Sequence, residues 1–113
     1  MIFLVDTNIL VRLSDSGSPD HAICLSAMRQ LLGRGDEARG CAQAAIDYWS
    51  VATRPIGANG LGLDPHAASL ALQDSGRWLA GLPEPPDILP RWRTLVARHD
   101  IRGRQAHDTR LVA

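Results

Sequence analysis

The first apolar run of the chain predicts a buried strand. Residues 2–5 read IFLV without a polar interruption, a pattern typical of parallel-sheet strands that are covered on both faces. Asp6, Thr7 and Asn8 follow at once, and the apolar residues 9–11 then fit the first turn of a helix. A strand, a polar triplet and a helix are the opening of an α/β unit, so we expect an α/β fold with a parallel sheet.

Cap and breaker residues divide the rest of the chain into further helices. Ser18 and Pro19 fit the N-cap and first position of a helix, and Gly33 and Gly35 fit its end. The same signals predict helices over residues 18–33, 44–54, 64–80, 91–99 and 106–113. Weaker patterns predict a short strand at residues 40–42 and an extended segment at 82–90. The glycine-rich residues 57–62 lack the G-x-G-x-x-G pattern and follow a helix, which predicts a plain connector.

Length and composition indicate one globular domain over residues 1–113. The chain is 45% hydrophobic and 21% charged, which is ordinary for a globular protein. Its longest apolar run is far shorter than the roughly 20 residues that span a bilayer. There is no charged leader of a secretory signal, and Cys24 and Cys41 form no C-x-x-C pair, which predicts reduced thiols. We therefore expect a cytoplasmic protein with no membrane partner.

The basic residues carry a sharper exclusion, because all 12 are arginine. Without lysine the chain cannot form a Walker P-loop or a Schiff base. The charge is also uneven: residues 1–50 hold four arginines against six acids, a balance of −2, and residues 88–113 hold six arginines against two acids, a balance of +4. Such a basic end favours phosphate, although a solvated helical face explains it equally well.

Three aspartates are candidates for chemistry. Asp6 falls at the carboxyl end of the first strand, where open α/β sheets gather ligands. Asp47 lies in an apolar helix at the edge of an inward face to which we assign Ile46, Trp49 and residues 52–53, and Asp108 opens the last helix. Each also has a plain structural interpretation, since Asp6 would cap a helix and the other two would be favoured by a helix dipole.

The context of these aspartates resembles a known family. The segments IFLVDTNIL, QAAIDYWSVATRP and QAHDTRLVA together resemble a PIN domain, and more narrowly the VapC-type toxin ribonucleases of bacterial toxin–antitoxin pairs. The resemblance covers the whole chain in order. It implies a PIN-like three-layer α/β/α fold with a parallel sheet and a carboxylate cluster that holds one or two Mg²⁺ or Mn²⁺ ions.

The resemblance also implies an activity and its residues. The family cleaves single-stranded RNA with metal-activated water, and its acids match Asp6, Asp47 and Asp108. Asn8, and more weakly Thr7, would orient these ligands. The partners implied are the RNA and a cognate antitoxin, and a homodimer stays open. RNA phosphate is a weaker expectation for the arginines that surround Asp108, namely Arg102, Arg104 and Arg110.

The chemistry of Mg²⁺ agrees with this assignment. Mg²⁺ prefers oxygen ligands and usually keeps several waters. Carboxylates that crowd together repel one another, and a divalent cation relieves that repulsion. Because the metal itself lowers the pKa of bound water, no histidine or lysine base is required.

Two departures from the family pattern matter. Asp47 stands where the family most often has glutamate, so its reach is shorter by about 1.5 Å, one C–C bond. The family usually continues after the HDTRLVA helix into two more strands and a fourth acid, whereas this sequence ends at Ala113. We therefore expect an incomplete PIN-like domain, in which residues 2–5 form an open apolar edge.

Two alternatives follow. One is a catalytically inactive PIN-like module that binds RNA or an antitoxin partner. The other is a phosphate-transferring α/β domain with Asp6 as nucleophile. Two absences count against this last alternative, because a dehalogenase-like phosphatase would want a second aspartate where Asn8 stands and a response-regulator receiver would want a late lysine.

Overall fold

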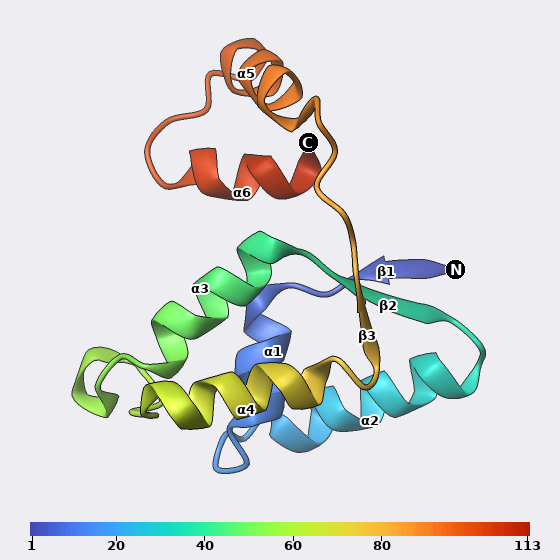
Figure 1. Cartoon of the computed structure of the whole chain (residues 1–113), viewed down its shortest axis with the longest axis vertical. Coiled ribbons are helices and arrows are strands. Elements are labelled where there is room, and N and C mark those ends of the chain that lie inside the picture. The colour runs from blue at the N-terminus through green and yellow to red at the C-terminus, as the bar shows by residue number, and fades with distance from the viewer. The chain divides into compact units, whose positions relative to one another are not determined.

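A computed structural model describes all residues 1–113 and divides the chain into two compact units (Figure 1). The first unit comprises Met1–Leu82 and contains every strand, and the second comprises Pro83–Ala113 and is helical. No helix in either unit has the length and apolar character needed to cross a membrane. The single domain expected over the whole length remains a prediction.

The first unit is built on a parallel sheet, as the sequence predicts. Its strands are β1 (Ile2–Leu4), β2 (Glu37–Gly40) and β3 (Leu79–Gly81), in the order β1-β2-β3. The register pairs Phe3 with Ala38 and Ala38 with Leu79, so these side chains share one face. Because all strands run in one direction, their carboxyl ends lie at the same edge of the sheet.

The predicted helices are all present, with shifted boundaries. In the first unit they are α1 (Thr7–Ser14), α2 (His21–Gly33), α3 (Ala42–Ala52) and α4 (Pro65–Ser75), with a 3-10 turn at Ile56–Ala58. In the second unit they are α5 (Ile88–Arg98) and α6 (Gln105–Val112).

The boundary errors occur where tertiary pairing outweighs the local signal. The helix predicted to reach residue 80 ends at Ser75, because Leu79–Gly81 pairs with β2 as the third strand. The strand predicted at residues 40–42 lies at Glu37–Gly40, because Ala42 already begins α3. The helix predicted from Ser18 starts at His21, after a turn in which the Ser18 hydroxyl accepts from the Asp20 amide.

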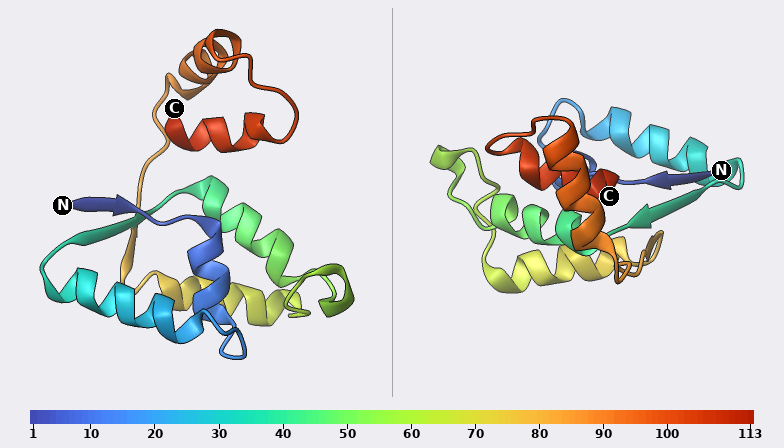
Figure 2. Two further views of the ribbon diagram at one scale, coloured as in Figure 1. Left: turned by 180° about the vertical axis from the view of Figure 1, so that it is seen from behind. Right: turned by 90° about the horizontal axis from the view of Figure 1, so that it is seen from above.

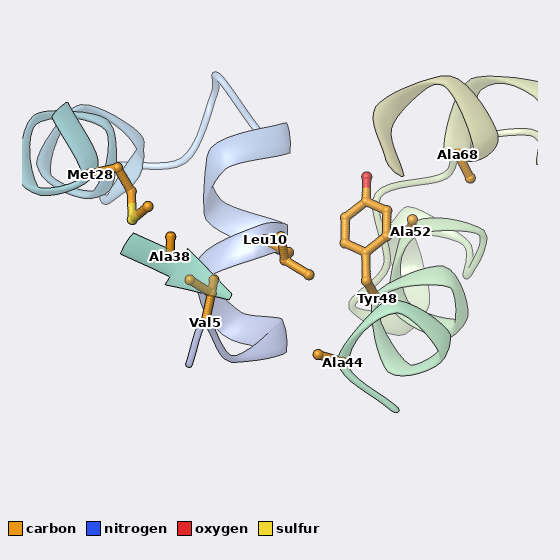
Figure 3. Close-up of a cluster of buried hydrophobic side chains, with 8 residues drawn as sticks. All are labelled: Val5, Leu10, Met28, Ala38, Ala44, Tyr48, Ala52 and Ala68. Carbon is orange, nitrogen blue, oxygen red and sulfur yellow. The ribbon is translucent and has the colours of Figure 1, made fainter. Parts of the chain in front are cut away.

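The core of the first unit lies between the sheet and helices α1 to α4 (Figures 1 and 2). Figure 3 shows Tyr48 of α3 extending alongside α1, with Leu10 facing it. The rest of this buried cluster is small or aliphatic and consists of Val5, Met28, Ala38, Ala44, Ala52 and Ala68. Tyr48 is the largest fully buried side chain, at 1% exposure.

The inward face of α3 differs from the prediction. Ile46 is 64% exposed and Trp49 is 36% exposed. The buried apolar positions are Ala44, Tyr48 and Ala52, which recur every four residues, and of these only Ala52 was predicted to face inward. The alanines let α3 approach its neighbours closely, and the size of Ile46 and Trp49 carried no information about which side faced inward.

The first strand is also less covered than its apolar sequence predicts. Ile2 is 62% exposed and Leu4 is 45% exposed. Both side chains alternate away from the face that carries Ala38. β1 is the outermost strand, so one of its edges has no neighbour. The open apolar edge expected from the sequence is therefore present.

The glycine-rich connector folds back on the end of α3, as predicted. The amide of Gly62 donates to the Arg54 carbonyl, and that of Leu63 donates to the Ala52 carbonyl. A Cβ on Gly60 would lie 2.0 Å from the Arg54 carbonyl oxygen, so only glycine fits there. With its amides turned to the chain's own carbonyls, this loop is a connector and not a phosphate cradle.

Asp36 fastens the start of β1 and gives a pH-dependent contribution to stability. The N-terminal ammonium donates to its carboxylate at 3.0 Å, and Arg34 donates at 2.8 Å. These contacts, the ammonium first, hold the pKa of Asp36 below its ordinary value of 3.8. Because the folded state lowers this pKa, the stabilisation is present at neutral pH and is lost as the pH falls below 3.8.

Asp36→Asn is therefore expected to lower the melting temperature at neutral pH. The difference between wild type and variant should shrink as the pH falls below about 4, where the unfolded-state carboxyl also protonates. Thermal melts of both proteins across this range check the expectation. A difference that stays constant into acid would show that the effect is not electrostatic.

Candidate metal centre

Asp6 lies after the carboxyl end of β1, directly before the first residue of α1. Its backbone is fixed on both sides, because the Val5 amide donates to the Arg39 carbonyl and the Asp6 carbonyl accepts from Ile9. One carboxylate oxygen of Asp6 accepts from the Thr7 amide at 2.7 Å, which makes Asp6 the N-cap of α1. The capping interpretation is thus correct, and it leaves the second oxygen of this exposed carboxylate without a hydrogen bond.

Asp47 lies on the helix that follows the neighbouring strand β2. α3 begins just after the carboxyl end of β2, and Asp47 lies exposed in its second turn. The Thr7 hydroxyl donates to the Ala44 carbonyl at 3.2 Å and ties the start of α1 to the first turn of α3. Thr7 therefore positions the two helices that carry Asp6 and Asp47. No sequence signal pointed to the Ala44 carbonyl as its partner, since any residue supplies that atom.

The other predicted residues are placed as follows. Asn8 is exposed in the first turn of α1, next to Thr7. Asp108 is exposed in the first turn of α6 and belongs to the second unit. Arg102 chelates Asp100, with contacts of 2.9 and 3.1 Å, and Arg110 pairs with Glu84. Arg104 is exposed at the N-cap of α6 and makes no ion pair.

The predicted acids differ from most others in the chain by having no ion-pair partner. Neither Asp47 nor Asp108 makes an ion pair or a side-chain hydrogen bond, and Asp6 makes only its cap. Arginine or the N-terminal ammonium neutralises Asp20, Asp36, Glu37, Asp74, Glu84, Asp87 and Asp100. The candidate carboxylates therefore keep their charge and lone pairs available for a cation.

The carboxylate oxygens of these residues are the kind of ligand that a magnesium-type ion prefers. No three histidine, cysteine or acidic side chains gather closely enough to form a complete cage. Mg²⁺ does not need one, since it is usually bound by one or two carboxylates and completes its shell with water. Asp6 and Asp47 offer two such carboxylates from helices that pack on each other. The contribution of Asp108 is a prediction that rests on the sequence.

The comparisons with known proteins bear on the fold. No family of known sequences matches the chain, and neither does any curated protein. The chain is similar to the crystal structure of VapC20 of Mycobacterium tuberculosis, a toxin that cleaves the sarcin–ricin loop. The match covers 99% of this chain and 78% of the toxin's, with a TM-score of 0.66 and 17% identity. The expected PIN-like α/β fold with a parallel sheet is thereby confirmed, from a sequence resemblance of short segments.

Proposed function

We propose that this protein is a metal-dependent endoribonuclease of the VapC toxin type, which cleaves single-stranded RNA. The observation that carries the proposal is the pair of exposed, unneutralised carboxylates, Asp6 and Asp47, at the carboxyl edge of a parallel sheet with the fold of a VapC toxin. Ligands of open α/β sheets bind at this edge.

Each residue has a defined role in this proposal. Asp6, Asp47 and Asp108 would hold Mg²⁺ or Mn²⁺, and Thr7 and Asn8 would support them. The cap bond from the Thr7 amide fixes one oxygen of Asp6, so the carboxylate presents its other oxygen in a defined direction. The Thr7–Ala44 bond fixes the start of α1 against the first turn of α3, the two helices whose first turns lie next to Asp6 and Asp47.

When bound, such an ion lowers the pKa of a coordinated water and neutralises charge at the attacked phosphate. The chain's own contribution is to supply anionic oxygen at a solvent-open edge, where an RNA strand can enter. Asp47 is shorter than the glutamate of the family, and a water between Asp47 and the ion would make up the difference, because Mg²⁺ tolerates water ligands well.

The proposal extends to the biological setting. A toxin of this type has a cognate antitoxin that inhibits it, and it acts on RNA in the cytoplasm. The antitoxin and the cytoplasmic RNA follow from the toxin assignment and stand or fall with it, and a homodimer stays open.

An RNA-cleavage assay tests the proposal. A fluorescently labelled single-stranded RNA is incubated with the purified chain in millimolar Mn²⁺ or Mg²⁺, and in EDTA. Cleavage in metal and its absence in EDTA are the expected results. Equal cleavage in both buffers would contradict metal dependence and would indicate a contaminating metal-independent ribonuclease.

The second candidate is an inactive PIN-like module that binds RNA or an antitoxin. The feature that favours it is Asp47, which is one methylene shorter than the glutamate most common at this position of the family. It predicts RNA binding without cleavage in any metal. The same assay, combined with a binding measurement on the same RNA, separates the two functions.

A further inference from the structure

We infer that the loop between α5 and α6 binds the phosphate backbone of single-stranded RNA, through Arg98 and Arg104. This inference rests on the proposed function, because it names a second contact for the same substrate. It concerns the second unit alone. Arg98 is the last residue of α5 and Arg104 is the N-cap of α6, so both flank one short connection.

The charge of this connection is available to a ligand. Arg98 and Arg104 are exposed and make no ion pair. A third arginine of the connection, Arg102, is held by Asp100 on two nitrogens. We call Arg98, Arg102 and Arg104 the arginine patch. Two of its guanidinium groups are free, and the third, that of Arg102, is neutralised. Guanidinium is the group that best matches phosphate oxygens, because its donors form a planar fork.

Backbone hydrogen bonds fix the conformation of the connection before any ligand binds. The Ile101 amide donates to the Val96 carbonyl at 3.0 Å and the His99 amide donates to Leu95, which closes the end of α5. Asp100 between them has a φ of +50°, a left-handed conformation that aspartate and asparagine tolerate. Little backbone entropy would then be lost on binding, which favours recognition of an extended polyanion.

The position of Arg104 connects the patch to the candidate acids. Arg104 and Asp108 are four residues apart, which places both on one side of α6. The residues of α6 that line the contact with α5 are others: Ala106, which accepts a bond from Trp92 at 2.7 Å, together with His107 and Arg110. A phosphate held by Arg104 would thus lie within one helical turn of Asp108, which is exposed on the same side.

The polar groups of the patch favour the RNA backbone over the bases. The indole nitrogen of Trp92 is already bonded to the Ala106 carbonyl, and no tyrosine or phenylalanine lies in the second unit. Stacking platforms are what base-directed single-strand binders provide. Binding through Arg98 and Arg104 should therefore be independent of base sequence and strongly dependent on salt.

The test is binding of a short fluorescein-labelled oligouridine in EDTA, measured by anisotropy between about 50 and 200 mM salt. Arg98→Gln combined with Arg104→Gln should weaken binding on the order of tenfold at low salt, and should reduce the salt slope by about 1.4, or 0.7 for each contact. Asp100→Asn should tighten binding and steepen the slope by about 0.7, because it frees Arg102 and keeps the left-handed residue.

The matched control is Arg29→Gln combined with Arg54→Gln. These arginines are exposed in the first unit and make no ion pair, so the control removes the same charge elsewhere. Equal weakening of binding by both double variants would contradict the claim that the patch binds RNA. Unchanged binding by Arg98→Gln/Arg104→Gln would contradict it as well. Polyglutamate can also be tested as a ligand in place of oligouridine. If it binds as tightly as oligouridine and its binding also depends on Arg98 and Arg104, the ligand is an acidic protein and the proposal that it is RNA is wrong.

The two proposals fail separately in these experiments. Binding in EDTA needs neither an ion nor cleavage, so a chain without ribonuclease activity can still show the arginine dependence. If the chain cleaves RNA with metal but binds oligouridine equally with and without Arg98 and Arg104, the proposed function stands and the proposed role of the patch is wrong.

Discussion

Asp6→Asn is expected to abolish metal-dependent RNA cleavage and leave the fold intact. The asparagine oxygen can still accept from the Thr7 amide, and asparagine is as good an N-cap as aspartate. What is lost is the anionic oxygen that faces the ion. If that interaction provides about 3 kcal/mol of transition-state stabilisation, the rate falls by roughly a hundredfold or more. The measurement is the initial rate of RNA cleavage in Mn²⁺, with a thermal melt in EDTA beside it.

The chain offers a matched control for this substitution. Asp64 is the N-cap of α4 and accepts from the Ala67 amide at 2.8 Å, so it has the same chemical role as Asp6 at another helix. Asp64→Asn should retain full cleavage. If Asp6→Asn also cleaves at the wild-type rate, Asp6 does not hold the catalytic ion and the proposed site is wrong.

Tyr48→Ala is expected to cause the largest loss of stability of any single truncation in the first unit. Tyr48 is 1% exposed and fills the space between α1 and α3, in a core whose other members are mostly alanine (Figure 3). A half-open pocket of about 300 Å³, lined in part by Leu10 and Trp78, already adjoins it. Truncation of a buried aromatic side chain costs about 3–5 kcal/mol.

Two companion variants separate the parts of this effect. Tyr48→Phe removes only the hydroxyl, which donates to Ser14 at 2.8 Å, and should cost about 1 kcal/mol. Trp49→Ala truncates a larger aromatic residue that is 36% exposed, and should cost less than Tyr48→Ala. Denaturant melts of the three variants give the comparison. A loss at Trp49 that equals or exceeds the loss at Tyr48 would contradict the burial pattern.

Local signals predicted the elements of this fold better than their burial. The polar triplet after IFLV placed the start of α1 within two residues, and Asp64 with Pro65 correctly placed that of α4. Such capping signals involve only residues within one turn of one another, so the local sequence is enough to predict them. β3 was missed because it consists of Leu79–Gly81 and exists through pairing with β2, which local sequence does not encode.

Burial depended on facts that the pattern of the sequence does not contain. The apolar run of β1 suggested cover on both faces, yet Ile2 and Leu4 are exposed because they point away from the face of the sheet that carries Ala38. On α3 the larger residues Ile46 and Trp49 were assigned to the core together with Ala52, and of these only Ala52 is buried, beside Ala44 and Tyr48. Which side of a helix is inward is decided by close approach, and small residues permit it.

The candidate site shows the same division. The sequence placed Asp6 at the end of a strand and Asp47 on a later helix, and the structure has Asp6 at the carboxyl end of β1 and Asp47 on α3, the helix that follows β2. It did not predict that Arg102 and Arg110 would be taken up by Asp100 and Glu84, because ion pairing depends on loop geometry. That pairing is what separates Arg104 from Arg102 and Arg110, the other two arginines that were expected to meet RNA, and Arg98, which was not predicted, likewise makes no ion pair.

The central claim is that Asp6 and Asp47 form a divalent-metal site, and a thermal melt in increasing Mn²⁺ against EDTA tests it most directly. A ligand that binds only the folded state at a hundred times its Kd adds about 2.7 kcal/mol, a rise on the order of 10 °C for a chain of this size. We predict that rise for wild type and for Asp64→Asn, and none for Asp6→Asn combined with Asp47→Asn. A cooperative transition at the same temperature in Mn²⁺ and in EDTA would contradict the claim.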